Sequence, residues 1–217
     1  MRSIVKVYDQ IAESWYNFRH WTRFPAELED LSRRWQKGRL LNIGCGHGAD
    51  FVPFRDGFEL WGLESSVEML KLAPRYARKF DFEANLVQGD ACFLPFSDHA
   101  FDWALSVATY HHLETELERK AAFQELSRVL KPDGEALITV WNRHQPRFWF
   151  QPKEVQIPWR TKEETLYRYH YLFSYPELKR IAEEAGLKVL KEFPEKSYRF
   201  PLKFFSRNIC ILVKKLS

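Results

Sequence analysis

Three closely spaced glycines are the first residues that could take part in chemistry. Gly44, Gly46 and Gly48 directly follow the apolar residues 40–43. Glycine lets a backbone turn tightly and approach a ligand where a Cβ atom would collide. With Ala49, the spacing also satisfies the Gly-x-Gly-x-x-Gly/Ala pattern of dinucleotide-binding folds. The glycines therefore predict a nucleotide-cofactor turn but do not name the cofactor.

Two acidic residues follow the next two predicted strands. Glu64 comes directly after residues 58–63, and Asp90 follows residues 84–88. The first could accept hydrogen bonds from both ribose hydroxyls of a nucleotide, and the second from an adenine amino group. Either acid alone could also be a solvated strand end or a helix cap. Their order along residues 39–141 resembles the class I S-adenosylmethionine-dependent methyltransferases, with a nicotinamide enzyme as the alternative.

The resemblance implies a fold and a cofactor. The fold would be α/β and Rossmann-like, a seven-stranded sheet of order 3-2-1-4-5-7-6 with helices on both faces. The cofactor would be S-adenosyl-L-methionine. The resemblance places it on Tyr8, Gly44, Cys45, Gly46, Gly48, Glu64, Ser65, Asp90, Ala91 and Ser106.

Periodicity and turn signals position these residues in one domain, residues 1–217. Helices are expected at 4–20, 25–35, 65–79, 115–130 and 174–186, the third opened by a capping box from Ser65 to Glu68. Strands are expected at 40–43, 58–63, 84–88, 101–108, 135–141, 187–193 and 209–213. The parts would be N-terminal lid helices (1–38), a cofactor-binding core (39–141), a substrate-facing insertion (142–173), and a closing helix and strands (174–217).

Composition narrows the class of protein. Of 217 residues, 45% are hydrophobic and 16% aromatic, which favours one globular domain with a full core. No run approaches the roughly 20 apolar residues of a membrane span, and the first residues lack the apolar core of a signal peptide. Cys45, Cys92 and Cys210 are scattered and odd in number, which favours reduced thiols over disulfides or a zinc site. We therefore expect a cytoplasmic protein without metal or membrane attachment.

Charge is segregated along the chain. Residues 43–142 carry 9 Lys/Arg against 16 Asp/Glu, whereas residues 143–217 carry 16 against 8. Basic flanks around an acidic core favour a polyanionic substrate, although charge runs can also be solvated faces. The insertion 142–173 is irregular and longer than a connection requires, so its aromatic residues are expected to face substrate or to pack as core.

Two histidines and three arginines are the candidates for handling substrate. His111 and His112 follow the fourth predicted strand, where a transferred methyl group would pass. One could face substrate, or they could cap a helix and pack in the core. Arg19, Arg147 and Arg168 could clamp an anion, because a guanidinium matches a carboxylate bidentately, or be surface charges. Residues 106–112, which contain the two histidines, lack the Asn/Asp-Pro-Pro-Tyr motif of amino-methylating enzymes, which disfavours N-methylation.

A narrower resemblance covers most of the chain. The segments that carry it are Tyr8-Asp-Gln-Ile-Ala, Arg19, Phe24-Pro25, His111-His112, Trp141, Ile157-Pro-Trp159 and residues 167–173. They look like the tRNA wobble-uridine carboxymethyl methyltransferases, which form the methyl ester of 5-carboxymethyluridine. The family's Arg-Tyr-Tyr-His reads Arg-Tyr-His-Tyr here, at residues 168–171. The resemblance assigns Arg19 with His111 or His112 to the substrate carboxylate, and Trp141, Trp159, Arg168 and Tyr169 to the substrate nucleoside.

The resemblance also implies partners. These are the tRNA anticodon stem-loop and a small zinc-binding activator protein that would extend the sheet at strand 84–88. This strand carries no charge and lies at an edge in the expected order, where unpaired backbone invites another chain. A loop covering the edge is the alternative. The competing functions are a small-molecule methyltransferase of the quinone or lipid-precursor type, and an inactive cofactor-binding subunit.

Overall fold

The central sheet has seven strands in the order β3-β2-β1-β4-β5-β9-β8 in this computed structural model, which describes residues 3–161, 163–200 and 202–216. The strands are β1 (Gly38–Ile43), β2 (Phe58–Glu64), β3 (Asn85–Gln88), β4 (Phe101–Val107), β5 (Leu130–Trp141), β8 (Leu187–Pro194) and β9 (Asn208–Lys215). Strands β1 to β5 are parallel, whereas β9 is antiparallel to β5 and β8. Because β6 and β7 form a separate hairpin, this is the expected 3-2-1-4-5-7-6 topology, which is confirmed.

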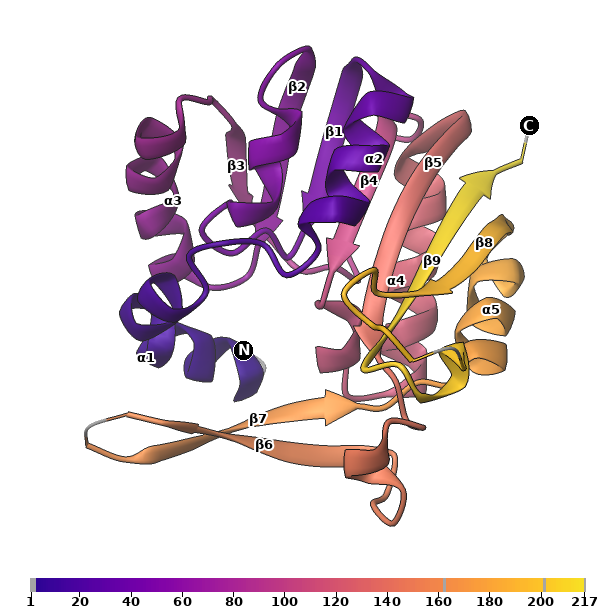
Figure 1. The fold of residues 1–217 in the computed structure, drawn as a ribbon. Coiled ribbons are helices and arrows are strands. Elements are labelled where there is room, and N and C mark those ends of the chain that lie inside the picture. The colour runs from indigo at the N-terminus through magenta and orange to yellow at the C-terminus, as the bar shows by residue number, and fades with distance from the viewer. Residues whose placement is uncertain (1–2, 162, 201, 217) are drawn as a thin grey trace.

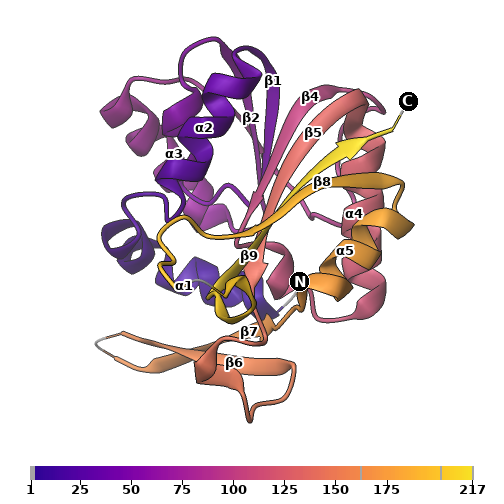
Figure 2. The same cartoon turned by 45° about the vertical axis from the view of Figure 1, so that its right-hand side comes forward.

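Helices cover both faces of the sheet, with α4 and α5 on one side and α2 and α3 on the other (Figure 2). Their bounds are α1 (Ser3–Phe18), α2 (Pro25–Trp35), α3 (Val67–Phe80), α4 (Glu116–Val129) and α5 (Tyr175–Glu184). None of the helices in the described residues is long and apolar enough to cross a membrane.

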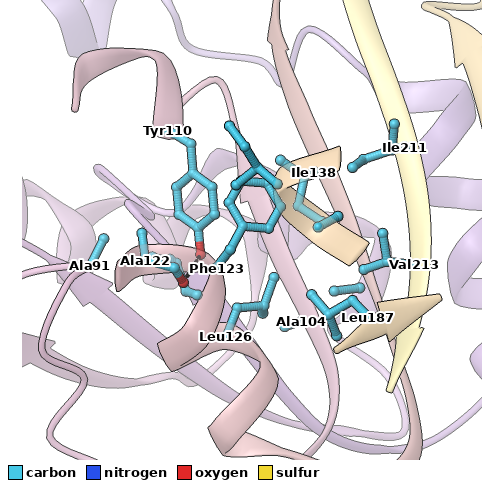
Figure 3. Close-up of a cluster of buried hydrophobic side chains, with 14 of the residues drawn as sticks. Ala91, Ala104, Tyr110, Ala122, Phe123, Leu126, Ile138, Leu187, Ile211 and Val213 are labelled. Carbon is cyan, nitrogen blue, oxygen red and sulfur yellow. Dashed lines mark hydrogen bonds between the residues drawn. The ribbon is translucent and has the colours of Figure 1, made fainter. Parts of the chain in front are cut away.

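The face under α4 and α5 holds the largest apolar cluster (Figure 3). Phe123 and Leu126 of α4 are fully buried against Ile138 of β5. Each such side chain contributes roughly 2 kcal/mol by leaving water. The Tyr110 hydroxyl donates to the Ala122 carbonyl at 3.1 Å, which fastens the segment after β4 to α4. The core therefore fixes the end of β4, where the two histidines follow.

The start of α3 differs from the expected capping box at Ser65. The cap is Ser66, whose Oγ accepts from the Met69 N–H at 3.2 Å. Asp9 of α1 accepts from the Ser66 hydroxyl at 2.6 Å and from the Glu68 N–H at 3.3 Å. An acid at a helix N-terminus is favourable electrostatically. Asp9 therefore holds α1 against the turn at the end of β2.

The insertion after β5 is not irregular as expected. It contains an antiparallel hairpin of β6 (Glu154–Arg160) and β7 (Thr165–Tyr171), which projects below the sheet next to α1 (Figure 1). Pro158 breaks the usual strand pattern, but a proline is tolerated in a two-stranded hairpin because both strands are edges. The alternating aromatic residues of β7 were the signal for this strand. The hairpin gives the aromatic side chains fixed directions.

Candidate active site

A cavity of about 590 Å³ lies at the carboxyl ends of β1, β2 and β4, the usual ligand position in an open α/β sheet. Tyr8 and Trp15 of α1 and Trp159 and Arg168 of the hairpin line it from the other side. The Trp159 Nε1–H donates to the Ser14 Oγ at 3.0 Å, and the ring centroids of Trp15 and Trp159 are 5.3 Å apart. The first helix and the hairpin thus form one roof over the cavity.

The glycine turn forms the floor of the cavity. Gly44 has φ 75°, and a Cβ there would lie 2.2 Å from the Thr109 Oγ1, so a larger residue does not fit. Gly46 has φ 55° and its Cβ position faces open space, which lets a ligand approach the backbone. Cys45 also lines the cavity, whereas Gly48 lies outside the lining, beside a second hollow. Gly48 therefore shapes the turn without being placed to contact a ligand.

Glu64 holds this turn in position. Its Oε2 accepts from the Gly46 N–H at 2.9 Å, and its Oε1 accepts from the Ser66 N–H at 2.9 Å and the Ser65 hydroxyl at 3.3 Å. Burial raises the pKa of the Glu64 carboxyl, and these donors act in the opposite direction. The carboxylate therefore fixes the glycine turn to the start of α3, and its side chain lines the same cavity.

Some of the other predicted cofactor residues line the cavity, and one does not. Asp90, Ala91 and Ser65 line the cavity, and the Asp90 Oδ1 accepts from the Cys92 N–H at 2.8 Å. Ser106 is buried within β4 and lies outside the lining, which starts one residue later at Val107. Because side chains alternate along a strand, the Ser106 side chain is not placed to contact a ligand there.

The two adjacent histidines have different roles in the structure. The His112 Nδ1 lies 2.8 Å from the Tyr169 carbonyl, so it must donate a hydrogen bond, and its Nε2 then accepts from the Tyr8 hydroxyl at 2.8 Å. The His111 Nδ1 is buried without a partner among the described residues. Both rings line the cavity. His112 therefore orients Tyr8, whereas no described residue holds the His111 Nδ1 by a hydrogen bond.

His170 belongs to the site but was not among the predicted residues. It is buried, and its Nδ1 donates to the Arg168 carbonyl at 3.0 Å. Its ring centroid lies 4.3 Å from that of Trp141 and 4.5 Å from that of His112. Arg168 and His170 line the cavity, whereas Tyr169 between them does not, and its hydroxyl donates to the Glu114 carbonyl at 3.1 Å. The alternation of β7 explains this, and Tyr169 supports His112 through its carbonyl.

Arg19 and Arg168 bring two guanidinium groups to the cavity. The Nε of each is buried without a hydrogen-bond partner, and neither forms an ion pair with another described residue. The Arg168 guanidinium lies 5.0 Å from the Trp159 ring and 5.5 Å from the Trp15 ring. Burial, followed by the nearby Arg23 and Arg168, lowers the pKa of Arg19 to about 10. The roof therefore carries two guanidinium groups that no described acidic residue pairs with.

The three histidines are neutral at physiological pH. Burial lowers the pKa of His112 to about 4 and also lowers the pKa values of His111 and His170. The unfolded chain takes up these protons below pH 6.5, before the folded chain does. The stabilising contribution of neutral His112 is therefore present above pH 6.5 and lost as pH falls to about 4.

We expect the free energy of unfolding to fall by about 3 kcal/mol over this range from His112 alone. Urea denaturation at a series of pH values measures it. The variant His112→Asn should show a shallower pH dependence by about one bound proton. An unchanged slope would show that folding does not shift the pKa of His112.

The ring nitrogens of His111, His112 and His170 lie within 4.8 Å of one another, a spacing that could hold a metal ion. The charge of Arg168 lowers the pKa of all three and would also repel a cation. The His112 Nε2 is moreover engaged by Tyr8. We interpret the group as a hydrogen-bonding cluster, and the absence of a metal requirement stays a prediction.

Known proteins resemble this chain in sequence. Residues 41–138 match the family described as "Methyltransferase domain". A putative methyltransferase of Encephalitozoon cuniculi is 30% identical over 190 residues, 84% of each protein. The tRNA (carboxymethyluridine(34)-5-O)-methyltransferase of Schizosaccharomyces pombe is 28% identical over 212 residues, 86% of this chain and 89% of that protein. The chain spans only 33% of the similar Arabidopsis thaliana enzyme of the same name.

Solved structures share the fold. An S-adenosylmethionine-dependent methyltransferase of Clostridium acetobutylicum superposes with a TM-score of 0.75 at 14% identity, covering 97% of this chain and 100% of that one. A Haloferax volcanii putative methyltransferase, solved with the Trm112 methyltransferase activator, gives 0.70 at 18% identity, covering 99% and 98%. The cavity fits the cofactor, since a glycine turn, Glu64 and Asp90 surround a space of ligand size. The chain therefore belongs to the class I S-adenosylmethionine-dependent methyltransferases.

Proposed function

We propose that this methyltransferase acts on tRNA and forms the methyl ester of 5-carboxymethyluridine at the wobble position. The observation that carries the proposal is the pair Arg19 and Arg168, two guanidiniums that line the cavity with the cofactor turn and form no ion pair with another described residue. Arg168 is buried and Arg19 is half-buried. A buried cation without a counter-charge is costly, so a carboxylate that enters beside Arg168 binds favourably. The name of the Schizosaccharomyces pombe relative supports the same substrate.

The chemistry requires alignment more than proton transfer. A carboxymethyl group has a pKa of about 4 and is ionised at neutral pH. When bound, S-adenosylmethionine supplies an electrophilic methyl group on a sulfonium. A carboxylate oxygen would accept this methyl group and S-adenosylhomocysteine would leave, so no proton would move and the task of Arg19 and Arg168 would be to orient the carboxylate. The neutral histidines of the site suit this reaction, because no general base is needed.

The lining residues described above have the following roles in the proposal. Arg19 and Arg168 hold the carboxylate, and His111 contacts the uracil. His112 fixes Tyr8 beside the uracil. Trp141 and Trp159 form the walls for the nucleoside. The cofactor is held by Gly44, Cys45, Gly46, Glu64, Ser65, Asp90 and Ala91.

The carboxyl-terminal third favours RNA over a small molecule. Residues 143–217 carry 16 Lys/Arg against 8 Asp/Glu, and the hairpin that roofs the cavity belongs to this part. An uncharged small substrate gives no reason for this excess, whereas phosphates do. A cytoplasmic location is part of the proposal.

The experiment that tests the substrate compares two tRNAs. One carries 5-carboxymethyluridine at the wobble position, and the other carries uridine there. With labelled S-adenosylmethionine, we expect methylation of the first tRNA only. Equal labelling of both, or labelling of neither while small carboxylic acids react, would contradict the proposal.

We further propose that a small zinc-binding activator pairs with β3. This strand lies at the edge of the sheet (Figure 1), and its side chains are only half-buried or exposed. A hollow of about 560 Å³ lies beside it, with Phe58, Phe82 and Leu86 among its lining residues. A strand that extends the sheet would cover this apolar hollow. The Haloferax volcanii protein of similar fold was solved as a complex with the Trm112 methyltransferase activator, which supports the proposal.

Two substitutions test this edge. Leu86→Lys should abolish complex formation with a Trm112-type activator, because a charge would enter the apolar contact. Asn85→Lys alters an exposed position of β3 and should weaken binding without affecting the core packing of Leu86. Size-exclusion chromatography with the activator measures both effects. The activator proposal would be contradicted if the unaltered chain and both variants methylated tRNA fully without any activator.

A further inference from the structure

A group of aromatic side chains lies on the surface beside the cavity, formed by two segments far apart in sequence. We call it the aromatic platform and define it as His144, Trp149, Phe200, Phe204 and Phe205. The ring centroids of Trp149 and Phe205 are 5.7 Å apart, and those of Phe204 and Phe205 are 5.2 Å apart. Phe200 lies 6.2 Å from Phe205, and His144 stacks on Phe204 at 4.0 Å.

The platform is exposed to solvent, whereas aromatic side chains that pack in the core are buried. Trp149 and Phe200 are each 55% exposed and Phe204 is 48% exposed. The indole of Trp149 is also held in place, because its Nε1–H donates to the His144 carbonyl at 2.8 Å. Contiguous exposed apolar surface with fixed geometry marks a binding site. Flat, unsaturated groups can stack on the exposed ring faces of the platform.

The charge around the platform is positive. Residues 143–152 and 196–207 contain six Lys/Arg and no Asp/Glu. Lys196 and Lys203 pair with Asp30 and Glu192, whereas Arg147 and Arg199 form no ion pair with any described residue. Exposed aromatic rings among unpaired arginines are the arrangement that binds single-stranded nucleic acid, since bases stack on the rings and phosphates meet the cations.

The platform is continuous with the mouth of the cavity. Arg147, next to Phe148 and Trp149, lines the cavity, as do Gln145, Arg207 and Asn208. The same two segments therefore supply both the cavity rim and the platform. A nucleotide inserted into the cavity would leave its neighbours in the strand at this surface.

We propose that the aromatic platform stacks the unpaired nucleobases that flank the target nucleoside in a single-stranded RNA loop. The inference rests on the proposed function, and it adds a second contact region outside the cavity. Each stacked base should improve affinity by roughly 5- to 100-fold. The platform would hold the loop open while the target base occupies the cavity.

Binding of a labelled anticodon stem-loop RNA, measured by fluorescence anisotropy with S-adenosylhomocysteine present, tests the inference. Trp149→Ala, Phe200→Ala and Phe204→Ala should each weaken binding roughly 5- to 100-fold, whereas Phe204→Tyr should not. Leu117→Ala on α4, at an 80% exposed apolar residue, and Lys188→Ala on β8 are matched controls that should have no effect. In methylation assays, the KM for tRNA should rise, while kcat and the KM for S-adenosylmethionine stay unchanged.

A second arm removes the bases. Removing the base beside the target, with an abasic stem-loop, should weaken binding to the unaltered protein. For the Phe200→Ala and Phe204→Ala variants, the abasic and the intact stem-loop should bind with the same affinity. Additive losses, or platform variants that bind and react normally while the unaltered protein methylates tRNA, would overturn this inference alone. If the unaltered protein neither binds nor methylates tRNA, the proposed function fails together with it. A dimer that dissociates on Phe204→Ala would instead make the platform a self-association surface.

Discussion

Replacing Arg168 by methionine is expected to lower kcat/KM for tRNA methylation by about 10²- to 10³-fold, because the substrate carboxylate loses a charge-assisted, bidentate partner. Arg168→Lys should recover only part of this loss, since an ammonium lacks the planar guanidinium geometry. Arg19→Ala should act in the same direction, with little change in cofactor affinity. Steady-state kinetics measures these effects, and the exposed Arg180→Met on α5 is the matched control.

The stability of the Arg168→Met variant separates a functional from a structural role. The substitution loses cation–π contacts with Trp15 and Trp159, worth roughly 1 to 2 kcal/mol together. It also removes a buried, unpaired charge, whose cost is at least as large. The free energy of unfolding should therefore not fall. A variant that is inactive because it is strongly destabilised would show that Arg168 serves the fold instead.

Replacing Glu64 by alanine is expected to weaken S-adenosylmethionine binding by about 10²-fold. The carboxylate would no longer accept from the ribose, and the Gly46 and Ser66 N–H groups would lose their acceptor, which loosens the turn. Isothermal titration calorimetry measures the affinity. Glu68→Ala, at a half-buried acid of α3 that pairs with Lys71, is the control. Unchanged affinity in Glu64→Ala would remove Glu64 from the cofactor site.

The sheet and the cofactor turn could be predicted because their signals are local. Each parallel strand is a short apolar run, and the residues that follow β1, β2 and β3 meet at one edge by topology alone. The strand boundaries were less predictable. β5 starts at Leu130, not at residue 135, because Leu130 already pairs with Phe101, and the register then shifts across Lys131-Pro-Asp-Gly before pairing resumes at Glu135.

The substrate half of the site could be predicted only in part, because it depends on the direction of side chains. Arg168, Trp141 and Trp159 do line the cavity. Tyr169 was predicted to contact the substrate and His170 was not, but His170 lines the cavity and Tyr169 does not. The hairpin was not recognised, and a shift of one residue along a strand moves a side chain to the opposite face. The engagement of both His112 nitrogens arises from Tyr8 and Tyr169, residues distant in sequence. No local pattern contains that information.

Identification of the methylated nucleoside tests the central claim most directly. tRNA carrying 5-carboxymethyluridine is incubated with the protein and with S-adenosylmethionine labelled in its methyl group, and then digested to nucleosides for mass spectrometry. We predict label only in 5-methoxycarbonylmethyluridine, and its complete loss as methanol after mild alkali, because an ester hydrolyses there. Alkali-stable label on a ring nitrogen, a carbon or a ribose oxygen would contradict the claim, as would label found only in small molecules.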